Sequence, residues 1–233
     1  MSDSGRSFRP PRRGNLEPTP RRTAAESQRE IAESAVRFLW KHPFRDLTVE
    51  KLMADTALSR PAFYQHFEDL HHLMETLLAK LDAALRASAN PWVSGEGDPI
   101  PALRESLRGV AQVCVEYGPV LRAVAEAAPL DERLERAWSM FLDHWDEAVA
   151  ARIEAQQRAG LIPQLDARQM ACALNRLDVA ILGDKLGRRP QADLETILDT
   201  LHRIWVSTLY GSTQALEGRP SKSRRRGSDK RKD

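Results

Sequence analysis

The stretch TVEKLMADTALSRPAFYQHF, residues 48–67, has the pattern of two short helices that meet at a sharp turn. Thr48 can cap the first helix, because its hydroxyl can accept a hydrogen bond from a free amide of the first turn. Ser59 can cap the second helix in the same way, and Pro61 lies in its first turn, where a missing amide proton costs nothing. Two phenylalanines four residues apart then anchor the second helix to a core. The stretch therefore predicts a helix-turn-helix.

The outer side of the predicted second helix carries side chains that suit DNA. With the phenylalanines facing inward, the residues left to face outward are Arg60, Ala62, Tyr64, Gln65 and His66. Arg and Gln can bind base edges through paired hydrogen bonds, and Tyr and His can bind phosphate oxygens. The same residues also fit an ordinary amphipathic helix pair with a polar face, so the pattern alone leaves both interpretations open.

The spacing of Ser59, Phe63, Tyr64, His66 and Phe67 resembles the pattern that the tetracycline-repressor (TetR) family carries before its long fourth helix. The resemblance implies an all-helical protein in which the helix that holds the tyrosine enters the major groove of DNA. The DNA-binding residues that follow from it are Thr48, Ser59, Arg60, Pro61, Ala62, Tyr64, Gln65 and His66.

Two positions depart from the family pattern. Ala57 stands in the turn, where the family usually has a glycine that adopts a left-handed conformation easily, so we expect some strain there. Leu70 stands where the family usually has a lysine that meets phosphate. His71 and His72 come next in the chain and are candidates to replace that contact.

The composition is that of a globular protein, because apolar residues make up 42% and charged residues 29% of the 233 residues. No window approaches 18 uninterrupted apolar residues, and the N-terminus lacks the apolar core of a signal peptide, so we expect a cytoplasmic protein with no membrane partner. Cys114 and Cys172 have neither a CxxC spacing nor a His at zinc-ligand intervals. The sequence therefore predicts no disulfide framework, no metal site and no cofactor.

The net charge of +2 is unevenly distributed. Residues 1–22 carry +4, residues 219–233 carry +6, and the remainder carries −8. Both tails are rich in Pro, Ser, Gly and Arg, so we expect residues 1–22 and 216–233 to be disordered. The N-terminal arm can either stay solvated or add sequence-independent attraction to phosphate beside the helix-turn-helix. For the C-terminal tail the solvated interpretation is preferred.

Helical periodicity covers the rest of the chain, without the alternating pattern of a strand. An amphipathic helix is predicted over residues 23–41, and a long helix over residues 69–89 is expected to end at Asn90-Pro91. Gly118-Pro119 is expected to break the first helix of the body. The remaining helices are predicted at about residues 103–117, 119–128, 130–159, 166–186 and 191–214, which makes nine helices and no sheet.

Trp138 and Trp145 lie seven residues apart and thus on one helix face, with Phe141 and Leu142 between them. In an arbitrary protein such a stripe is simply core. However, AWSMFLDHW, ACALNRLDVAIL and HRIWVSTLYG, which begin at residues 137, 171 and 202, resemble a TetR-family branch typified by the mycobacterial repressor of ethionamide activation. In that branch the matching helices line an apolar tunnel that binds hydrophobic ligands. The resemblance implies as tunnel residues Trp138, Phe141, Leu142, Trp145, Asn175 and Trp205 and, across an alignment gap, Val110, Val113, Cys114 and Tyr117.

Asp178 is a further candidate ligand contact, because it falls on a helix stripe with Leu174 and Ile181. The resembling branch more usually has Asn there, and a carboxylate in an apolar wall is costly unless it is paired or protonated. One explanation is a salt bridge to Arg176 or to another helix, or a helix orientation that leaves the carboxylate in water. The other is a ligand that offers a hydrogen-bond donor or a positive charge.

Enzymatic function is not indicated, because the sequence has no Gly-rich phosphate loop, nucleophile elbow or HExxH motif. We interpret the chain as a ligand-responsive transcriptional repressor, with a DNA-binding domain at residues 23–68 and a ligand-binding and dimerisation domain at residues 69–215. Its expected partners are a palindromic double-stranded DNA operator, a hydrophobic small-molecule effector and a second copy of the chain, paired through helices 166–186 and 191–214. The alternative is an architectural DNA-binding protein whose body only dimerises.

Overall fold

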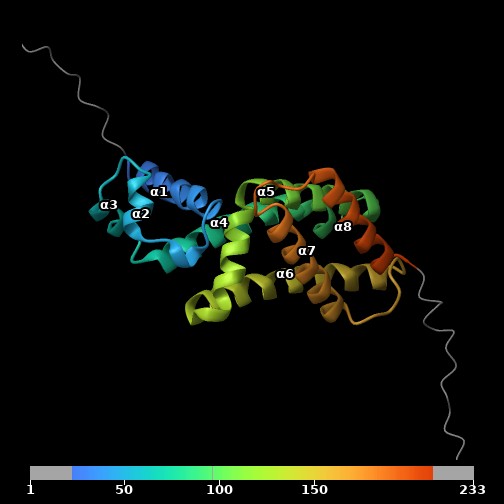
Figure 1. The fold of residues 1–233 in the computed structure, drawn as a ribbon. Helices are drawn as coiled ribbons and strands as arrows, with labels where there is room; N and C mark the ends of the chain where they lie inside the picture. Colours follow the sequence, from blue (N-terminus) through green and yellow to red (C-terminus); the bar gives the residue numbers. More distant parts are fainter. Residues whose placement is uncertain (1–22, 96, 212–233) are drawn as a thin grey trace, which may run out of the picture.

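The computed structural model describes residues 23–95 and 97–211, which form eight α-helices, two short 3-10 helices and, within these ranges, no strand. A small N-terminal head lies at one end of an elongated molecule, and a longer helical body forms the rest (Figure 1). The prediction of an all-helical protein is confirmed. The basic segments at residues 1–22 and 216–233, predicted to be disordered, lie outside the described residues.

The head consists of α1 (Ala24–Leu39), η1 (Phe44–Asp46), α2 (Val49–Ala54) and α3 (Arg60–Tyr64). α1 begins with a capping box, in which the Thr23 hydroxyl accepts from the Glu26 amide and the Glu26 carboxylate accepts from the Thr23 amide. The helices share a core whose side chains are at most 1% exposed, namely Ile31, Leu39, Leu52, Phe63, Phe67 and Leu73. The last of these belongs to the first body helix, so the head and the body have a continuous core.

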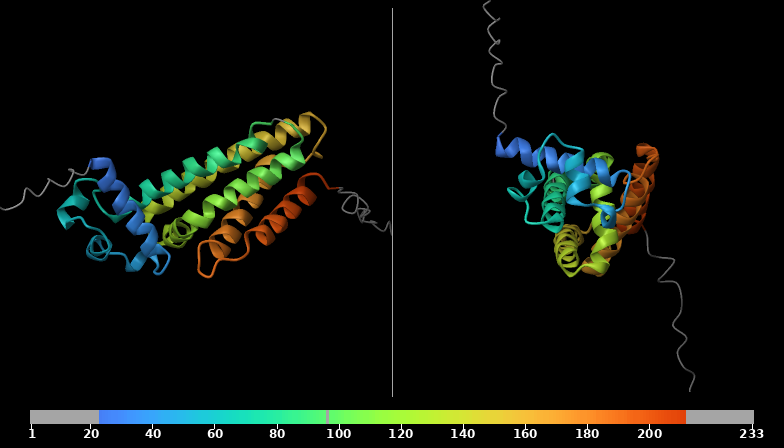
Figure 2. Two further views of the ribbon diagram at one scale, coloured as in Figure 1. Left: turned by 90° about the horizontal axis from the view of Figure 1, so that it is seen from above. Right: turned by 60° about the vertical axis from the view of Figure 1, so that its left-hand side comes forward.

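The body consists of α4 (Leu70–Val93), α5 (Pro99–Ala127), η2 (Ala128–Leu130), α6 (Glu132–Arg158), α7 (Ala167–Lys185) and α8 (Leu194–Leu209). Each of its α-helices begins after an aspartate whose carboxylate accepts a hydrogen bond from a first-turn amide, namely Asp69, Asp98, Asp131, Asp166 and Asp193. α4 leaves the head and runs beside α5 and α6, while α7 and α8 cover one side (Figure 2). α5 contacts every other body helix and also α1 and η1 of the head.

The predicted break at Gly118-Pro119 is wrong, and this reduces the number of α-helices from nine to eight. α5 continues through both residues, which are buried, and Gly118 lies against the loop between α7 and α8. A Cβ on Gly118 would lie only 2.9 Å from the Cα of Gly187, so the two backbones are in direct contact. Pro119 removes one backbone hydrogen bond, but packing on both sides of the helix outweighs this local preference.

The predicted end of α4 at Asn90-Pro91 is also wrong, because the helix continues to Val93. The additional turn buries Trp92, which is 2% exposed and whose amide donates to Ser106 Oγ at 2.8 Å. Burial of an indole stabilises by up to about 5 kcal/mol, whereas an interior proline costs about 3 kcal/mol. Tertiary packing therefore decides where this helix ends.

Candidate functional site

The outer side of α3 is the candidate DNA-binding surface. Phe63 is fully buried, which fixes the rotation of this short helix, and the neighbouring Tyr64 is 52% exposed. The two rings meet edge to face with centroids 5.2 Å apart. α3 ends sooner than predicted, at Tyr64, so Gln65 and His66 lie at its C-terminal end instead of within it.

The candidate DNA contacts differ in how accessible they are. The exposed ones are Thr48, Ser59, Arg60, Pro61, Tyr64 and Gln65, while Ala62 and His66 are half-buried. Thr48 caps α2, because its hydroxyl accepts from the Lys51 amide at 3.2 Å. Ser59 precedes α3 but makes no side-chain cap hydrogen bond, so its hydroxyl remains available to a partner outside the protein.

The turn and the start of α4 are held by contacts within the protein. The Ala57 amide donates to Glu30 Oε1 at 2.8 Å, which ties the turn to α1. His71 Nε2 lies 3.1 Å from Asp131 Oδ2, and His72 Nδ1 accepts from the Glu68 amide at 3.3 Å. Both histidines therefore already have protein partners, which does not favour the predicted replacement of a phosphate-binding lysine.

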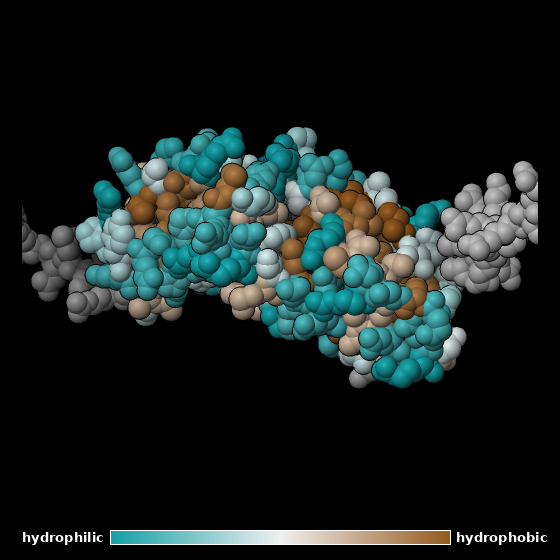
Figure 3. Space-filling model, turned by 90° about the horizontal axis from the view of Figure 1, so that it is seen from below, coloured by the Kyte–Doolittle hydropathy of each residue, from teal (hydrophilic) through white to brown (hydrophobic). Residues whose placement is uncertain are grey.

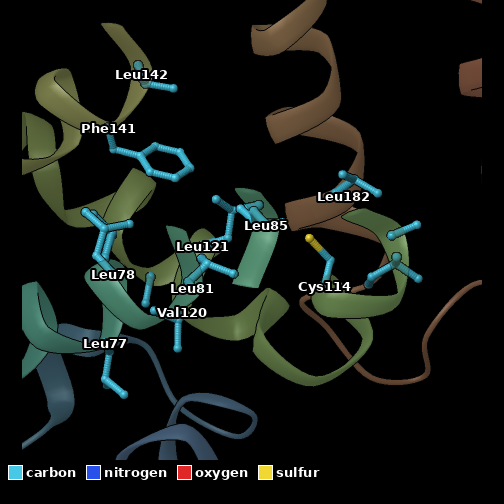
Figure 4. Packing of buried hydrophobic residues seen from close by; sticks show 14 of the residues in the cluster. Leu77, Leu78, Leu81, Leu85, Cys114, Val120, Leu121, Phe141, Leu142 and Leu182 are labelled. Atoms are coloured by element: carbon cyan, nitrogen blue, oxygen red, sulfur yellow. The ribbon is translucent and has the colours of Figure 1, made fainter. Parts of the chain in front are cut away.

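An apolar cavity of about 80 Å³ lies inside the body and is lined by residues of α4, α5, α6, α7 and α8. Figure 4 shows Leu85 of α4, Cys114 and Leu121 of α5 and Leu182 of α7 converging in this region. Burial raises the pKa of the Cys114 thiol to about 12, so the thiol stays neutral and acts as an apolar wall residue. The cavity can accept a small, mainly hydrocarbon molecule.

Eight of the candidate ligand contacts line this cavity, namely Val110, Cys114, Phe141, Leu142, Trp145, Asn175, Asp178 and Trp205. Val113, Tyr117 and Trp138 do not belong to the lining. Trp138 stacks on Phe141 instead, with ring centroids 5.2 Å apart, and so supports the wall from behind. The predicted aromatic stripe is therefore split between the cavity wall and the layer outside it.

Sequence reasoning missed the lining residues Leu85, Ala89, Trp92, Val93, Leu103, Ser106, Leu107, Leu121, Val149, Val179 and Leu182. Most are plain hydrophobic residues that no pattern distinguishes from other core positions. Trp92 and Val93 are different, because they follow the proline that was expected to end α4. Extension of the leucine stripe of α4 by one further turn would have found both.

Among the described residues, Asp178 is the only carboxylate of the cavity wall. One of its oxygens accepts a hydrogen bond from Trp205 Nε1 at 3.1 Å. Burial raises its pKa to about 7, and the hydrogen bond from Trp205 opposes this shift only in part. The expected salt bridge to Arg176 is absent, because the guanidinium binds Asp146 through two hydrogen bonds of 3.1 Å. In the described part of the chain no Arg, Lys or His forms an ion pair with Asp178.

The cavity is connected to the head through Arg122 of α5, which directly follows the wall residue Leu121. Its Nη2 donates to the Leu39 carbonyl at the end of α1 at 2.8 Å, and its Nε donates to the Gly187 carbonyl at 3.1 Å. Glu126 holds the same guanidinium at 3.2 Å. One side chain therefore links the head, α5 and the α7–α8 loop.

Further contacts tie the body to the head and to the first turns of α4. Arg133 of α6 pairs with Glu75 at 2.7 Å and with Asp69 at 3.0 Å. Arg189 in the α7–α8 loop lies over the ring of Trp40, 4.6 Å from its centroid.

A second cavity, of about 190 Å³, lies at this junction between η1, α5 and η2. It is lined by Pro43, Phe44, Arg45, Ala123, Glu126, Ala127, Leu130 and Asp131. The junction thus combines specific polar contacts with space for small movements.

No group of three or more His, Cys, Asp or Glu side chains within residues 23–95 and 97–211 could hold a metal ion. None of the helices in this part of the chain combines the length and the apolar character needed to cross a membrane.

Comparisons with known proteins identify the family of the chain. The family profile "Transcriptional regulator EthR, C-terminal domain" matches residues 103–211, which include most of the cavity wall. The HTH-type transcriptional regulator EthR of Mycobacterium tuberculosis is 31% identical over 208 residues, covering 84% of this chain and 95% of EthR.

Solved structures agree on the fold. A TetR-family regulator from Syntrophomonas wolfei superposes with a TM-score of 0.67 at 14% identity, over 80% of this chain and 96% of the other. A gamma-butyrolactone receptor superposes with a TM-score of 0.60 at 21% identity, over 82% and 92% of the two chains. Together with the identity to EthR along nearly the whole described chain, these matches show that the protein belongs to the TetR family of transcriptional regulators, in its EthR branch.

Proposed function

We propose that this protein is a transcriptional repressor that binds a palindromic operator as a homodimer and releases it when a hydrophobic small molecule fills the body cavity. The observation that carries the proposal is the pairing of an exposed recognition helix with a distant apolar cavity in one continuous core. The γ-butyrolactone receptor of the same fold is named for a small-molecule ligand, which supports a sensing role for the body.

Specific reading of DNA by this head requires a dimer. α3 has only five residues and can contact few base pairs, whereas two such helices about 34 Å apart can read successive major grooves. α7 offers a face for dimerisation, because Met170, Ala173, Leu177 and Ala180 form an apolar stripe at helical spacing that is half-buried or exposed in the single chain. Figure 3 shows hydrophobic surface on the body half of the molecule as well as on the head. Self-association through this face would cover it.

Ligand-induced release requires that the ligand prefer one conformation of the dimer over another. α4 is suited to transmit the preference, because Leu73 packs in the head core and Leu85 lines the cavity. Arg122 provides a second route, from the wall to the last carbonyl of α1. A ligand that shifts either element therefore changes the position of the two recognition helices.

The proposal is tested by selecting bound sequences from a random DNA pool and footprinting the recovered site. A discrete palindromic footprint is expected from a dimeric regulator, whereas the architectural alternative predicts a smear that depends strongly on salt. Apolar compounds that bind the cavity should then release this site. If compounds bind beside the cavity tryptophans and leave DNA affinity unchanged, the cavity is a loosely packed part of the core and not an effector site.

The recognition helix gives the first prediction. Arg60→Ala is expected to cost about 1–3 kcal/mol of operator binding and to relax base preference at one position per half-site. Tyr64→Phe should weaken binding to all sequences alike, because it removes a hydroxyl that binds phosphate but keeps the ring against Phe63. Titration of the selected operator and of single-base variants measures both effects. Unchanged affinity in both variants would contradict this docking geometry.

The junction gives the second prediction. Arg122→Met keeps the aliphatic stem but removes the hydrogen bonds to Leu39 and Gly187. We expect ligand affinity to stay within about three-fold, and the effect of ligand on operator affinity, typically about 5–150-fold in allosteric proteins, to fall substantially. Arg136→Met, an exposed arginine of α6 without a contact to the head, is the matched control. Full ligand response in Arg122→Met would assign the coupling to α4 alone.

A further inference from the structure

We infer that the effector of this protein is a cationic amphiphile, a hydrocarbon body that carries one ammonium group, and that Asp178 is the residue that selects it. The inference rests on the proposed function of the body cavity as the effector site, and it specifies the chemistry of the ligand. It follows from which hydrogen-bond donors and acceptors of the cavity wall already have partners within the protein.

Each donor side chain of the wall already makes a hydrogen bond within the protein, and the second N–H of Asn175 is the one for which no protein acceptor is identified among the described residues. Five lining side chains carry an N–H or O–H donor, and each one donates to a protein acceptor at a distance between 2.8 and 3.1 Å, namely Trp92 to Tyr210, Ser106 to the Ala89 carbonyl, Trp145 to Asp82, Asn175 to Asp146 and Trp205 to Asp178. The Cys114 thiol is only a weak donor. A ligand that needs donors from the protein, such as a carboxylate, therefore finds a poor match.

Asp178 differs from these donors, because its carboxylate oxygens can accept more hydrogen bonds than the described residues donate to them. A carboxylate can accept about four hydrogen bonds, and Asp178 accepts one, from the neutral Trp205. The nearest arginine in sequence, Arg176, is bound to Asp146, which is only 2% exposed. The wall therefore presents a carboxylate without a cation in mainly apolar surroundings, in which the other polar side chains are Ser106, Asn175 and the tryptophans.

An ammonium group supplies what this carboxylate lacks, since it brings both a positive charge and N–H donors. A neutral hydrocarbon would have the reverse effect, because it would displace solvent from the carboxylate without replacing its hydrogen bonds. The raised pKa of Asp178, about 7, means that a bound cation can keep the carboxylate ionised near neutral pH at a small free-energy cost. Apolar contacts with the rest of the wall would hold the hydrocarbon part.

The test compares hexylamine with 1-hexanol, which differ in charge but little in size. Calorimetry measures their dissociation constants, and fluorescence anisotropy of labelled operator measures DNA release. We expect the amine to bind wild-type protein at least about ten-fold more tightly than the alcohol, the factor of a single charge-assisted hydrogen bond. Asp178→Asn should abolish this preference, because the amide oxygen can still accept from Trp205 but the charge is gone. Asp143→Asn removes an exposed carboxylate of the neighbouring α6 and should retain the preference.

The outcomes separate this inference from the proposed function. Equal binding, tighter binding of the alcohol, no binding of either compound, or an amine preference that survives in Asp178→Asn would each overturn the inference. If the alcohol binds alone and still releases DNA, the proposed function stands and the inference fails. If the amine is preferred through Asp178 but leaves DNA bound, the ligand chemistry stands and the proposed function fails. Should Asp178→Asn not fold, the wild-type comparison of amine with alcohol decides.

Discussion

Leu177→Glu is expected to convert the dimer into a monomer and to reduce operator affinity by at least about a hundred-fold. Leu177 lies on the apolar stripe of α7 and is only half-buried in the single chain, so a glutamate there can stay in water in the monomer. In a symmetric interface the same change places two carboxylates in an apolar contact, and an unpaired buried charge costs about 3–5 kcal/mol. A monomer has one recognition helix, so the contacts to the second half-site are lost.

Sedimentation, circular dichroism and operator titration together test this expectation. Leu161→Glu is the matched control, because Leu161 is a 52% exposed leucine in the loop between α6 and α7, and the variant should remain dimeric. Leu201→Glu is not suitable as an interface probe, because Leu201 is 1% exposed within the single chain and its substitution would unfold the body. A helical Leu177→Glu variant that still sediments as a dimer would place the interface elsewhere.

Leu142→Trp is expected to imitate a bound ligand. Leu142 lines the cavity and is 8% exposed, so a larger ring at this position would occupy the space into which a ligand would bind. We expect a packing cost of about 1–3 kcal/mol, which a domain of this size can tolerate, and a 5–150-fold loss of operator affinity, about the range of allosteric coupling. Thermal unfolding measures the first quantity, and titration of the operator measures the second.

Leu142→Ala is the companion variant, because it enlarges the same cavity instead of filling it. It should lose stability by about 2–5 kcal/mol, the usual cost of such a truncation, but keep operator affinity close to that of wild type. A difference in DNA binding between the two variants at comparable stability would therefore come from occupation of the cavity. A folded Leu142→Trp variant with wild-type operator affinity would show that filling the cavity does not change DNA binding by the head.

The sequence predicts the head better than the body because the head depends on short-range patterns. The Thr48 cap acts on an amide three residues away, and the spacing of Phe63 and Phe67 determines which face of α3 is buried and leaves Tyr64 exposed. The end of α4 could not be predicted in the same way, because Trp92 is buried by partners from other helices, namely Ser106 of α5 and Trp205 of α8. Pro91 favours the end of a helix locally, and tertiary packing of the assembled core overrides this preference.

The cavity shows the same limit at the level of single residues. The stripe of Trp138, Phe141 and Trp145 was predicted to face one space, but a helix face about 100° wide can border both a cavity and a packed layer. The neighbouring helices determine which side chain lines the cavity and which packs outside it. Trp138 stacks on Phe141 and packs outside the cavity. For Asp178 the sequence indicates an unusual position, whereas the absence of a nearby free cation depends on where Arg176 and Asp146 meet.

The contact between Gly118 and Gly187 has a mechanical consequence. Two backbones that touch without side chains between them have no rotamers that could yield, so we expect α5 to tilt about this point more easily than it slides past the loop. Cys114 lies one turn before the contact and Arg122 one turn after it, and Arg122 also donates to the Gly187 carbonyl, so the contact and this hydrogen bond hold α5 to the same point of the loop. We therefore expect a tilt of α5 that moves the cavity wall at Cys114 to strain the hydrogen bond from Arg122 to the end of α1.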